Sequence, residues 1–192
     1  MSTHGRKPFL AGFICGLIFI LLVGFILVAI GAFDFSASNK PGVIENKLTP
    51  WAFERSMARR APKQNNPFVN DSTALSVGMA HYKENCLVCH GVPGSEPSEL
   101  SMGLNPSAPP LDDKGIQQLS DGQMFWIIQN GVRWSGMPAF GMTHKDEEIW
   151  KIVSFVRHLP QLTPEEKGKL IPKTEEDHHH EAASNANHSP AD

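Results

Sequence analysis

The chain has 192 residues, 41% of them hydrophobic, and a formal net charge of −3. This length would allow one domain, but the apolar residues are unevenly spread, and many of them lie near the N-terminus. Residues 75–163 carry six basic and nine acidic side chains, a net of −3, which argues against nucleic-acid binding.

The first predicted element is the apolar segment 9–33, which holds no charged side chain over 25 positions. At about 1.5 Å per residue this makes roughly 37 Å of helix, enough to cross a hydrocarbon core of about 30 Å with some tilt. A cleaved signal peptide is the alternative, but its apolar core would be shorter. Arg6 and Lys7 precede the segment and only Asp34 closely follows it. The positive-inside rule therefore places residues 1–8 in the cytoplasm and the rest of the chain outside.

Residues 34–71 are predicted to be a basic spacer. Between its terminal aspartates lie six basic side chains and two glutamates, a difference of +4. Thr49 and Pro50 are typical of a helix start and predict a short amphipathic helix over 51–60. This helix either lies among lipid headgroups or is a solvated linker without a partner. At the headgroups it would immerse its large apolar side chains, namely Trp51, Phe53 and Met57. Residues 61–67 predict a disordered tether that lets the next domain swing.

The next predicted helix starts at Asp71 or Ser72, since either side chain can cap it. Its apolar residues recur at steps of four, three and four and make one face, formed by Leu75, Met79, Tyr82 and Cys86. Gly78 lowers the stability of a helix relative to alanine, so its presence calls for a packing explanation.

This helix leads into Cys86-Leu-Val-Cys89-His90, which supplies two thiols and an imidazole at one spacing. Such a run is how c-type haem is attached: each thiol adds to a vinyl group of the porphyrin, and the histidine reaches the iron. A thioredoxin-type pair is one alternative, but it opens a helix after a strand. A zinc site is another, and it would need a further Cys or His pair. We therefore predict one haem c bound through Cys86 and Cys89, with His90 as an iron ligand.

The remaining elements follow from Pro, Gly and capping signals. Residues 92–115 are rich in Pro, Gly and Ser and predict a loop without helix or strand. A helix is predicted from Ser120, with Gln123 completing a capping box, to Gly131. A closing helix is predicted from a capping box of Thr143 and Asp146, with one apolar stripe formed by Ile149, Ile152, Val153, Val156 and Leu159. A short helix after Thr163 is expected to pack loosely.

Gly136-Met137-Pro138-Ala-Phe140 lies between these helices. A thioether is a soft donor suited to iron in an electron carrier, and the proline after Met137 stiffens the loop that presents it. Met142 and His144 are the alternative ligands.

Two groups of residues together resemble a class I c-type cytochrome over residues 72–163. They are Gly78 and Tyr82 ahead of the Cys-x-x-Cys-His-Gly motif, and a Gly-Met-Pro-x-Phe loop 47 residues after His90. The resemblance implies an all-α class I cytochrome c fold, with about three to five helices around one covalent haem ligated by His90 and Met137. It implies that the last helix crosses the first closely at Gly78. It also implies that a proline carbonyl, of Pro110 or alternatively Pro109, accepts the Nδ1 proton of His90.

We therefore predict a membrane-anchored monohaem electron carrier with no catalytic residue of its own. Its segments would be a cytoplasmic N-terminus (1–8), a membrane helix (9–33), a basic spacer (34–71), a haem domain (72–171) and a disordered acidic, His-rich tail (172–192). The tail is either solvated or captures divalent metal. The carrier would lie on the outer face of a bacterial cytoplasmic membrane, between a respiratory dehydrogenase or quinol-oxidising complex and an oxidase or other acceptor. An integral haem subunit of a larger oxidoreductase and a peroxidase-like or gas-reactive haem protein are the alternatives.

Overall fold

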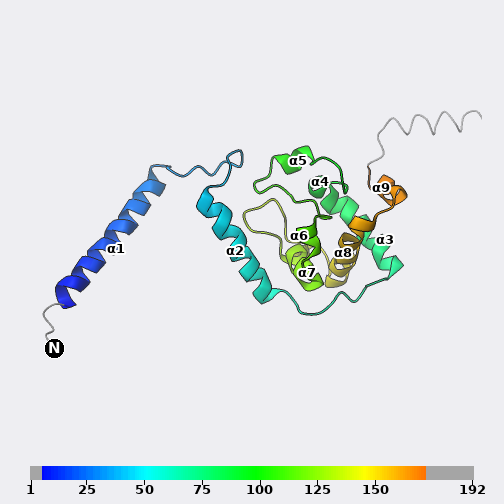
Figure 1. Cartoon of the computed structure of the whole chain (residues 1–192), viewed down its shortest axis with the longest axis horizontal. Helices are drawn as coiled ribbons and strands as arrows, with labels where there is room; N and C mark the ends of the chain where they lie inside the picture. The colour runs from blue at the N-terminus through cyan, green and yellow to red at the C-terminus, as the bar shows by residue number, and fades with distance from the viewer. Residues whose placement is uncertain (1–5, 172–192) are drawn as a thin grey trace, which may run out of the picture. The chain divides into compact units, whose positions relative to one another are not determined.

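The computed structural model of the chain describes residues 6–171 (Figure 1). The chain divides into two compact units, the first ending at Lys40 and the second starting at Pro41. The predictions for the first five residues and for the His-rich tail, 172–192, lie outside the described residues.

The first unit contains α1 (Arg6–Ala29). Within it, Phe9–Ala29 is long and apolar enough to cross a membrane, with a mean hydropathy of 3.0 over 21 residues and no part buried in the protein. Such a helix near an N-terminus serves as an anchor or a signal sequence. It ends four residues before the predicted limit, because Gly31 takes a positive φ of 69° that stops the helix.

The second unit consists of helices and connections only, and the described residues contain no strand. Its longer helices are α2 (Val43–Arg60), α3 (Ser72–His81), α7 (Asp121–Asn130), α8 (Asp146–His158) and α9 (Pro164–Leu170). Its short turns are η1 (Tyr82–Cys86), α4 (Leu87–His90), α5 (Glu99–Met102), α6 (Lys114–Gln117), η2 (Phe140–Met142) and η3 (Leu159–Gln161). The predicted all-α fold is confirmed, although α5 and α6 interrupt the stretch that was predicted to be without helix.

The core of this unit is the crossing of α3 and α8 (Figure 1). At Gly78 the two backbones are so close that a Cβ atom would lie within contact distance of the Lys151 carbonyl, 2.8 Å from its carbon, and 2.9 Å from Cβ of Phe155. One turn further along α3, the buried ring of Tyr82 packs against that of Phe155, with centroids 5.3 Å apart. The expected close crossing at Gly78 is present.

Most of the predicted helix ends are also present. Asp71 caps α3 by accepting from the backbone N–H groups of Thr73 and Ala74. Ser120 and Gln123 form the capping box of α7, and Gly131 ends it. The prediction for α8 was wrong: its N-cap is Lys145, whose backbone N–H donates to the Glu148 carboxylate at 2.7 Å.

The segment before α3 differs most from the prediction. The helix α2 starts at Val43 and runs through Pro50, whereas Pro50 was expected at its first position. Proline removes only its own N–H donor, and a helix can continue past it where packing holds both sides. Met57 of α2 is buried, and the Phe53 ring lies 6.2 Å from the ring of Trp126 in α7. Phe53 and Met57 thus pack against the rest of the second unit, so these two side chains are not available to contact lipid.

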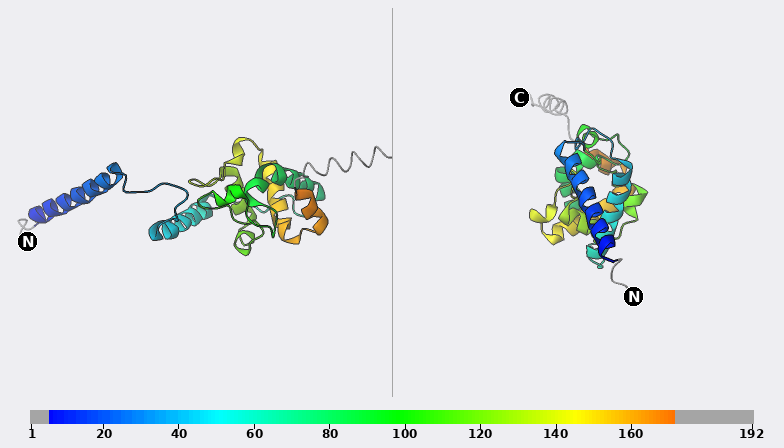
Figure 2. Two further views of the ribbon diagram at one scale, coloured as in Figure 1. Left: turned by 90° about the horizontal axis from the view of Figure 1, so that it is seen from above. Right: turned by 90° about the vertical axis from the view of Figure 1, so that its left-hand side faces the viewer.

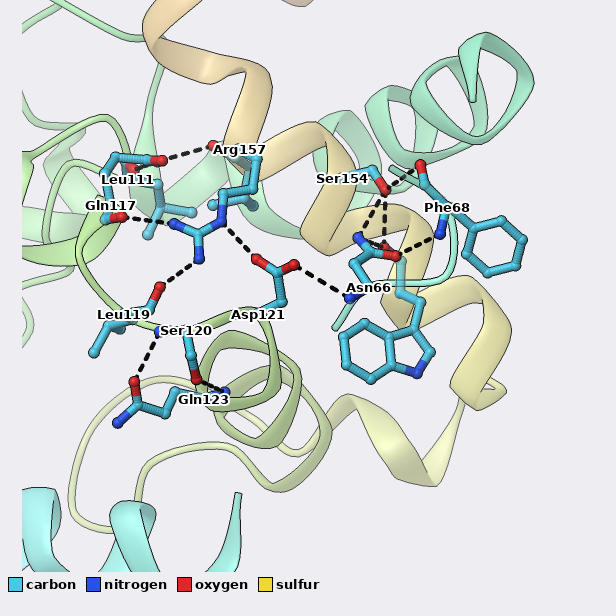
Figure 3. A network of polar contacts seen from close by, with 12 residues as sticks. Asn66, Phe68, Leu111, Gln117, Leu119, Ser120, Asp121, Gln123, Ser154 and Arg157 are labelled. Atoms are coloured by element: carbon cyan, nitrogen blue, oxygen red, sulfur yellow. Dashed lines mark hydrogen bonds and ion pairs between the residues drawn. The ribbon is translucent and has the colours of Figure 1, made fainter. Parts of the chain in front are cut away.

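Residues 61–67 are not a disordered tether. Asn66 is only 6% exposed, and its side-chain amide donates to the Trp150 carbonyl at 3.0 Å and to Ser154 Oγ at 2.9 Å. Its backbone N–H donates to the Asp121 carboxylate. Residues 61–67, which we call the strap, therefore contact both α7 and α8 (Figure 3). Gly122 leaves no room for a Cβ atom beside the Pro62 carbonyl. The segment between α2 and α3 is therefore held to the domain at Pro62 and at Asn66.

The final helix, α9, is also more firmly packed than predicted. Leu170 is fully buried in the core, and Lys83 Nζ donates to the Lys169 carbonyl at 2.8 Å. The orange α9 accordingly lies near the helical stretch that α3 and η1 form (Figures 1 and 2).

Candidate functional site

The Cys-x-x-Cys-His motif lies at the end of a helical stretch that begins with α3. After His81 the helix widens into the π-helical turn η1, which ends at Cys86, and then returns to α geometry in α4, which contains Cys89 and His90. A π turn adds one residue and so re-aims every side chain that follows it. Because Cys86 and Cys89 are three residues apart, both thiols lie on neighbouring positions of one helical face. No pattern in the sequence predicted the π turn.

The C-terminal end of the motif is fixed by a buried tyrosine. The Tyr82 hydroxyl donates to the Gly91 carbonyl at 2.7 Å, and Gly91 turns the chain away with a φ of 69°. Burial raises the pKa of Tyr82, so its hydroxyl stays a neutral donor. The contact joins the core at α3 to the residue directly after His90.

Cys86 lacks the lowered pKa that is typical of a redox-active cysteine. Cys86 and Cys89 are both free thiols. The pKa of Cys86 is raised to about 12, mainly by burial and to a smaller extent by the nearby Cys89. A redox-active cysteine needs the opposite, a lowered pKa that favours the thiolate. Among residues 6–171, no group of three or more His, Cys, Asp and Glu side chains is arranged to hold a metal ion. The thioredoxin and zinc alternatives therefore have no support in this part of the chain.

The imidazole of His90 is oriented by a backbone carbonyl. Its Nδ1 lies 2.8 Å from the carbonyl oxygen of Pro109, so Nδ1–H can donate there and leave the Nε2 lone pair free for a metal. Burial lowers the pKa of His90 and favours the neutral, ligating form. The choice of Pro110 was wrong. Successive carbonyls of an extended chain point to opposite sides, and that of Pro110 accepts from the Asp113 N–H at 3.3 Å.

Met137 lies in the loop that joins α7 to η2. The loop folds back on the end of α7, where a Cβ atom on Gly131 would lie 2.7 Å from the Pro138 carbonyl carbon. Inside the loop, the Val132 N–H donates to the Met137 carbonyl at 3.2 Å, and the Met137 N–H donates to Ser135 Oγ at 3.1 Å. The backbone on both sides of the thioether is therefore restrained.

The side chain of Met137 is half-buried and packs against the same core cluster as Cys86. The two alternative ligands are placed differently. Met142 is 86% exposed, and His144 Nδ1 lies 2.9 Å from Thr143 Oγ1 while its ring contacts those of His81 and Phe140. The structure thus favours Met137 among the three.

The donors on this unit fit a covalently held haem. They are two free thiols on one helical face, an imidazole with its outer nitrogen fixed, and a thioether on a restrained loop packed against the same core. This arrangement indicates a cytochrome c domain.

Comparison with known proteins supports this assignment. Residues 73–156 match the family described as cytochrome c oxidase, cbb3-type, subunit III. The chain therefore contains a cytochrome c domain, the kind of domain that carries covalent haem c, transfers electrons and works outside the cytoplasm. No curated protein matched.

Among solved structures, two cytochromes cL are similar to this chain. Cytochrome cL from Methylophaga aminisulfidivorans MPT is 21% identical, with a TM-score of 0.38, and the match covers 75% of this chain and 89% of that one. Cytochrome cL from Hyphomicrobium denitrificans is 19% identical, with a TM-score of 0.36, and the match covers 70% and 89%.

Proposed function

We propose that this protein is a monohaem electron carrier that α1 holds on the outer face of a bacterial cytoplasmic membrane. The observation that carries the proposal is the geometry of His90. This residue follows the free thiols of Cys86 and Cys89, and its Nδ1 lies 2.8 Å from the Pro109 carbonyl oxygen. A bound haem c would supply an iron that accepts and donates single electrons as it changes between the ferric and ferrous states. Its donors would be respiratory dehydrogenases or quinol-oxidising complexes, and its acceptors oxidases.

The residues of this chain have three tasks in that function. Cys86 and Cys89 would fix the porphyrin to the helix, so that it stays bound through every redox cycle. His90 and Met137 would ligate the metal, and a His/Met pair gives a higher potential than a pair of histidines. The Pro109 contact would keep His90 in one tautomer, so that ligation costs no reorientation.

Replacing Met137 by alanine tests the ligand assignment. Met137→Ala should lose the low-spin, six-coordinate spectrum of the purified holoprotein, should lower its potential, and should bind carbon monoxide when reduced. Met142→Ala is the matched control and should leave spectrum and potential unchanged, because Met142 is almost fully exposed. An unchanged spectrum in Met137→Ala would refute the assignment. Carbon monoxide binding by the reduced wild type would favour the gas-reactive alternative.

A second candidate is an integral haem subunit of a larger membrane oxidoreductase. It is favoured by the matched family, whose description names a subunit of a cbb3-type oxidase. Purification in mild detergent separates the two functions, because a subunit would elute with its complex and a free carrier would elute alone.

A further inference from the structure

The helix α2 has two opposite apolar faces, and only one of them is used by the protein. Phe53 and Met57 pack inward, on α7 and the core around it. Ile44, Leu48 and Trp51 recur at steps of four and three, and they are 78%, 56% and 56% exposed. At about 100° per residue, Ile44 and Phe53 are roughly 180° apart around the helix. We call the three exposed residues the outer stripe.

Basic side chains flank the outer stripe. On the same helical sector lie Lys47, Arg55 and Arg59, each exposed, while Glu45 and Glu54 lie at its edges, about 80° to 100° from its centre. A basic amphipathic helix with a tryptophan on its apolar face is the type that lies in the membrane interface. An anionic headgroup would neutralise the flanking cations, and the stripe would reach the acyl boundary.

The position of α2 in the chain also favours a membrane surface. Only 13 residues, 30–42, separate the end of α1 from the start of α2, a span of at most about 45 Å when fully extended. A membrane that α1 crosses is therefore always within reach of the outer stripe, and such tethering raises the local concentration of the binding surface.

We infer that the outer stripe of α2 binds the anionic lipid surface of the membrane that α1 crosses. Because the inner face of α2 packs on the cytochrome domain through Phe53 and Met57, binding of α2 would fix the orientation of the whole domain. The inference rests on the anchoring role of α1 proposed above. It differs from the sequence-based hypothesis, which placed Phe53 and Met57 in the lipid.

Spin-label accessibility on the full-length holoprotein tests this inference. All variants carry Cys15→Ser, since the haem takes up the other two thiols, and receive one new label site. Leu48→Cys places the label on the outer stripe. Ser76→Cys, on the exposed side of α3, is the matched control. The protein is inserted into vesicles of phosphatidylcholine, with or without phosphatidylglycerol, and the oxygen and nickel-chelate accessibilities of the label are compared.

In anionic vesicles the label at 48 should show a several-fold rise in its oxygen-to-nickel ratio, whereas the label at 76 should stay water-like. Arg55→Gln with Arg59→Gln should reduce that rise. A water-like label at 48 in vesicles that carry the protein overturns the inference and leaves the carrier function intact. An equal rise in neutral vesicles overturns the requirement for anionic lipid. A label at 48 that is buried only in native membranes identifies a protein partner instead of lipid. A chain that does not float with the vesicles overturns both this inference and the anchoring role of α1.

Discussion

The close crossing of α3 and α8 predicts a large effect of adding a single methyl group at Gly78. In Gly78→Ala the new Cβ would lie 2.9 Å from Phe155 Cβ and 2.8 Å from the Lys151 carbonyl carbon. Carbon atoms in contact are about 3.5–4.0 Å apart, so the helices must separate by roughly 0.6 to 1 Å. The neighbours are backbone and Cβ atoms and cannot turn aside. Overpacking of this kind costs about 3 kcal/mol, and the better helix propensity of alanine returns about 1 kcal/mol.

The expected net loss is thus about 2 kcal/mol, which for a domain of this size lowers Tm by roughly 10 °C. Thermal unfolding of the oxidised holoprotein, followed by circular dichroism and by haem absorbance, measures it. Gly168→Ala is the matched control, because Gly168 is also inside a helix but a Cβ atom there would meet nothing within 4 Å. It should gain about 0.5–1 kcal/mol. If Gly78→Ala were as stable as the wild type, the crossing would not be as close as described.

Two more predictions concern polar contacts on α8. Arg157 binds Asp121 at 2.8 Å and the carbonyls of Gln117 and Leu119 (Figure 3), so Arg157→Met should cost about 2–3 kcal/mol in denaturant unfolding. Lys169→Met, which removes an exposed ion pair, should cost under about 1 kcal/mol, and similar losses in both would refute this role of Arg157. The Lys145 N–H lowers the pKa of Glu148 in the folded protein below its usual 4.5. The ionised Glu148 therefore stabilises the fold fully above pH 4.5, and this stabilisation is lost as the pH falls through the lowered pKa of the folded state. Glu148→Ala should therefore have a lower Tm at pH 7, with a gap to the wild type that narrows and closes as the pH falls below 4.5. A gap that is constant with pH would contradict it.

The features that sequence predicted well are those whose cause is local or chemical. The thiols and imidazole of Cys86, Cys89 and His90 are identified by spacing alone, because their chemistry demands that order. Ser120 and Gly131 mark helix ends through contacts a few residues away. The assignment of Met137 as the second ligand stays a prediction, which the placement of its loop supports.

The features that sequence missed depend on partners far away in the chain. Asn66 is polar and lies between prolines, which is typical of a linker, yet its partners Trp150 and Ser154 are more than 80 residues distant. The choice between Pro109 and Pro110 depends on which carbonyl the loop turns toward His90, and the two residues are chemically identical. Neither outcome is encoded within a short window of sequence.

These long-range contacts change what the domain can reach. If residues 34–71 were a flexible tether of 38 residues, its ends would lie roughly 35 Å apart on average. With α2 and the strap packed on the domain, only residues 30–42 remain between α1 and the second unit. Even fully flexible, these 13 residues would span only about 20 Å on average. If α1 anchors the chain as proposed above, a carrier on so short a connection would stay near the membrane, and its partners would have to present their redox centres close to that surface. The same constraint suits a haem that serves a fixed neighbour in a complex, and membrane-proximal partners are therefore common to both proposed functions.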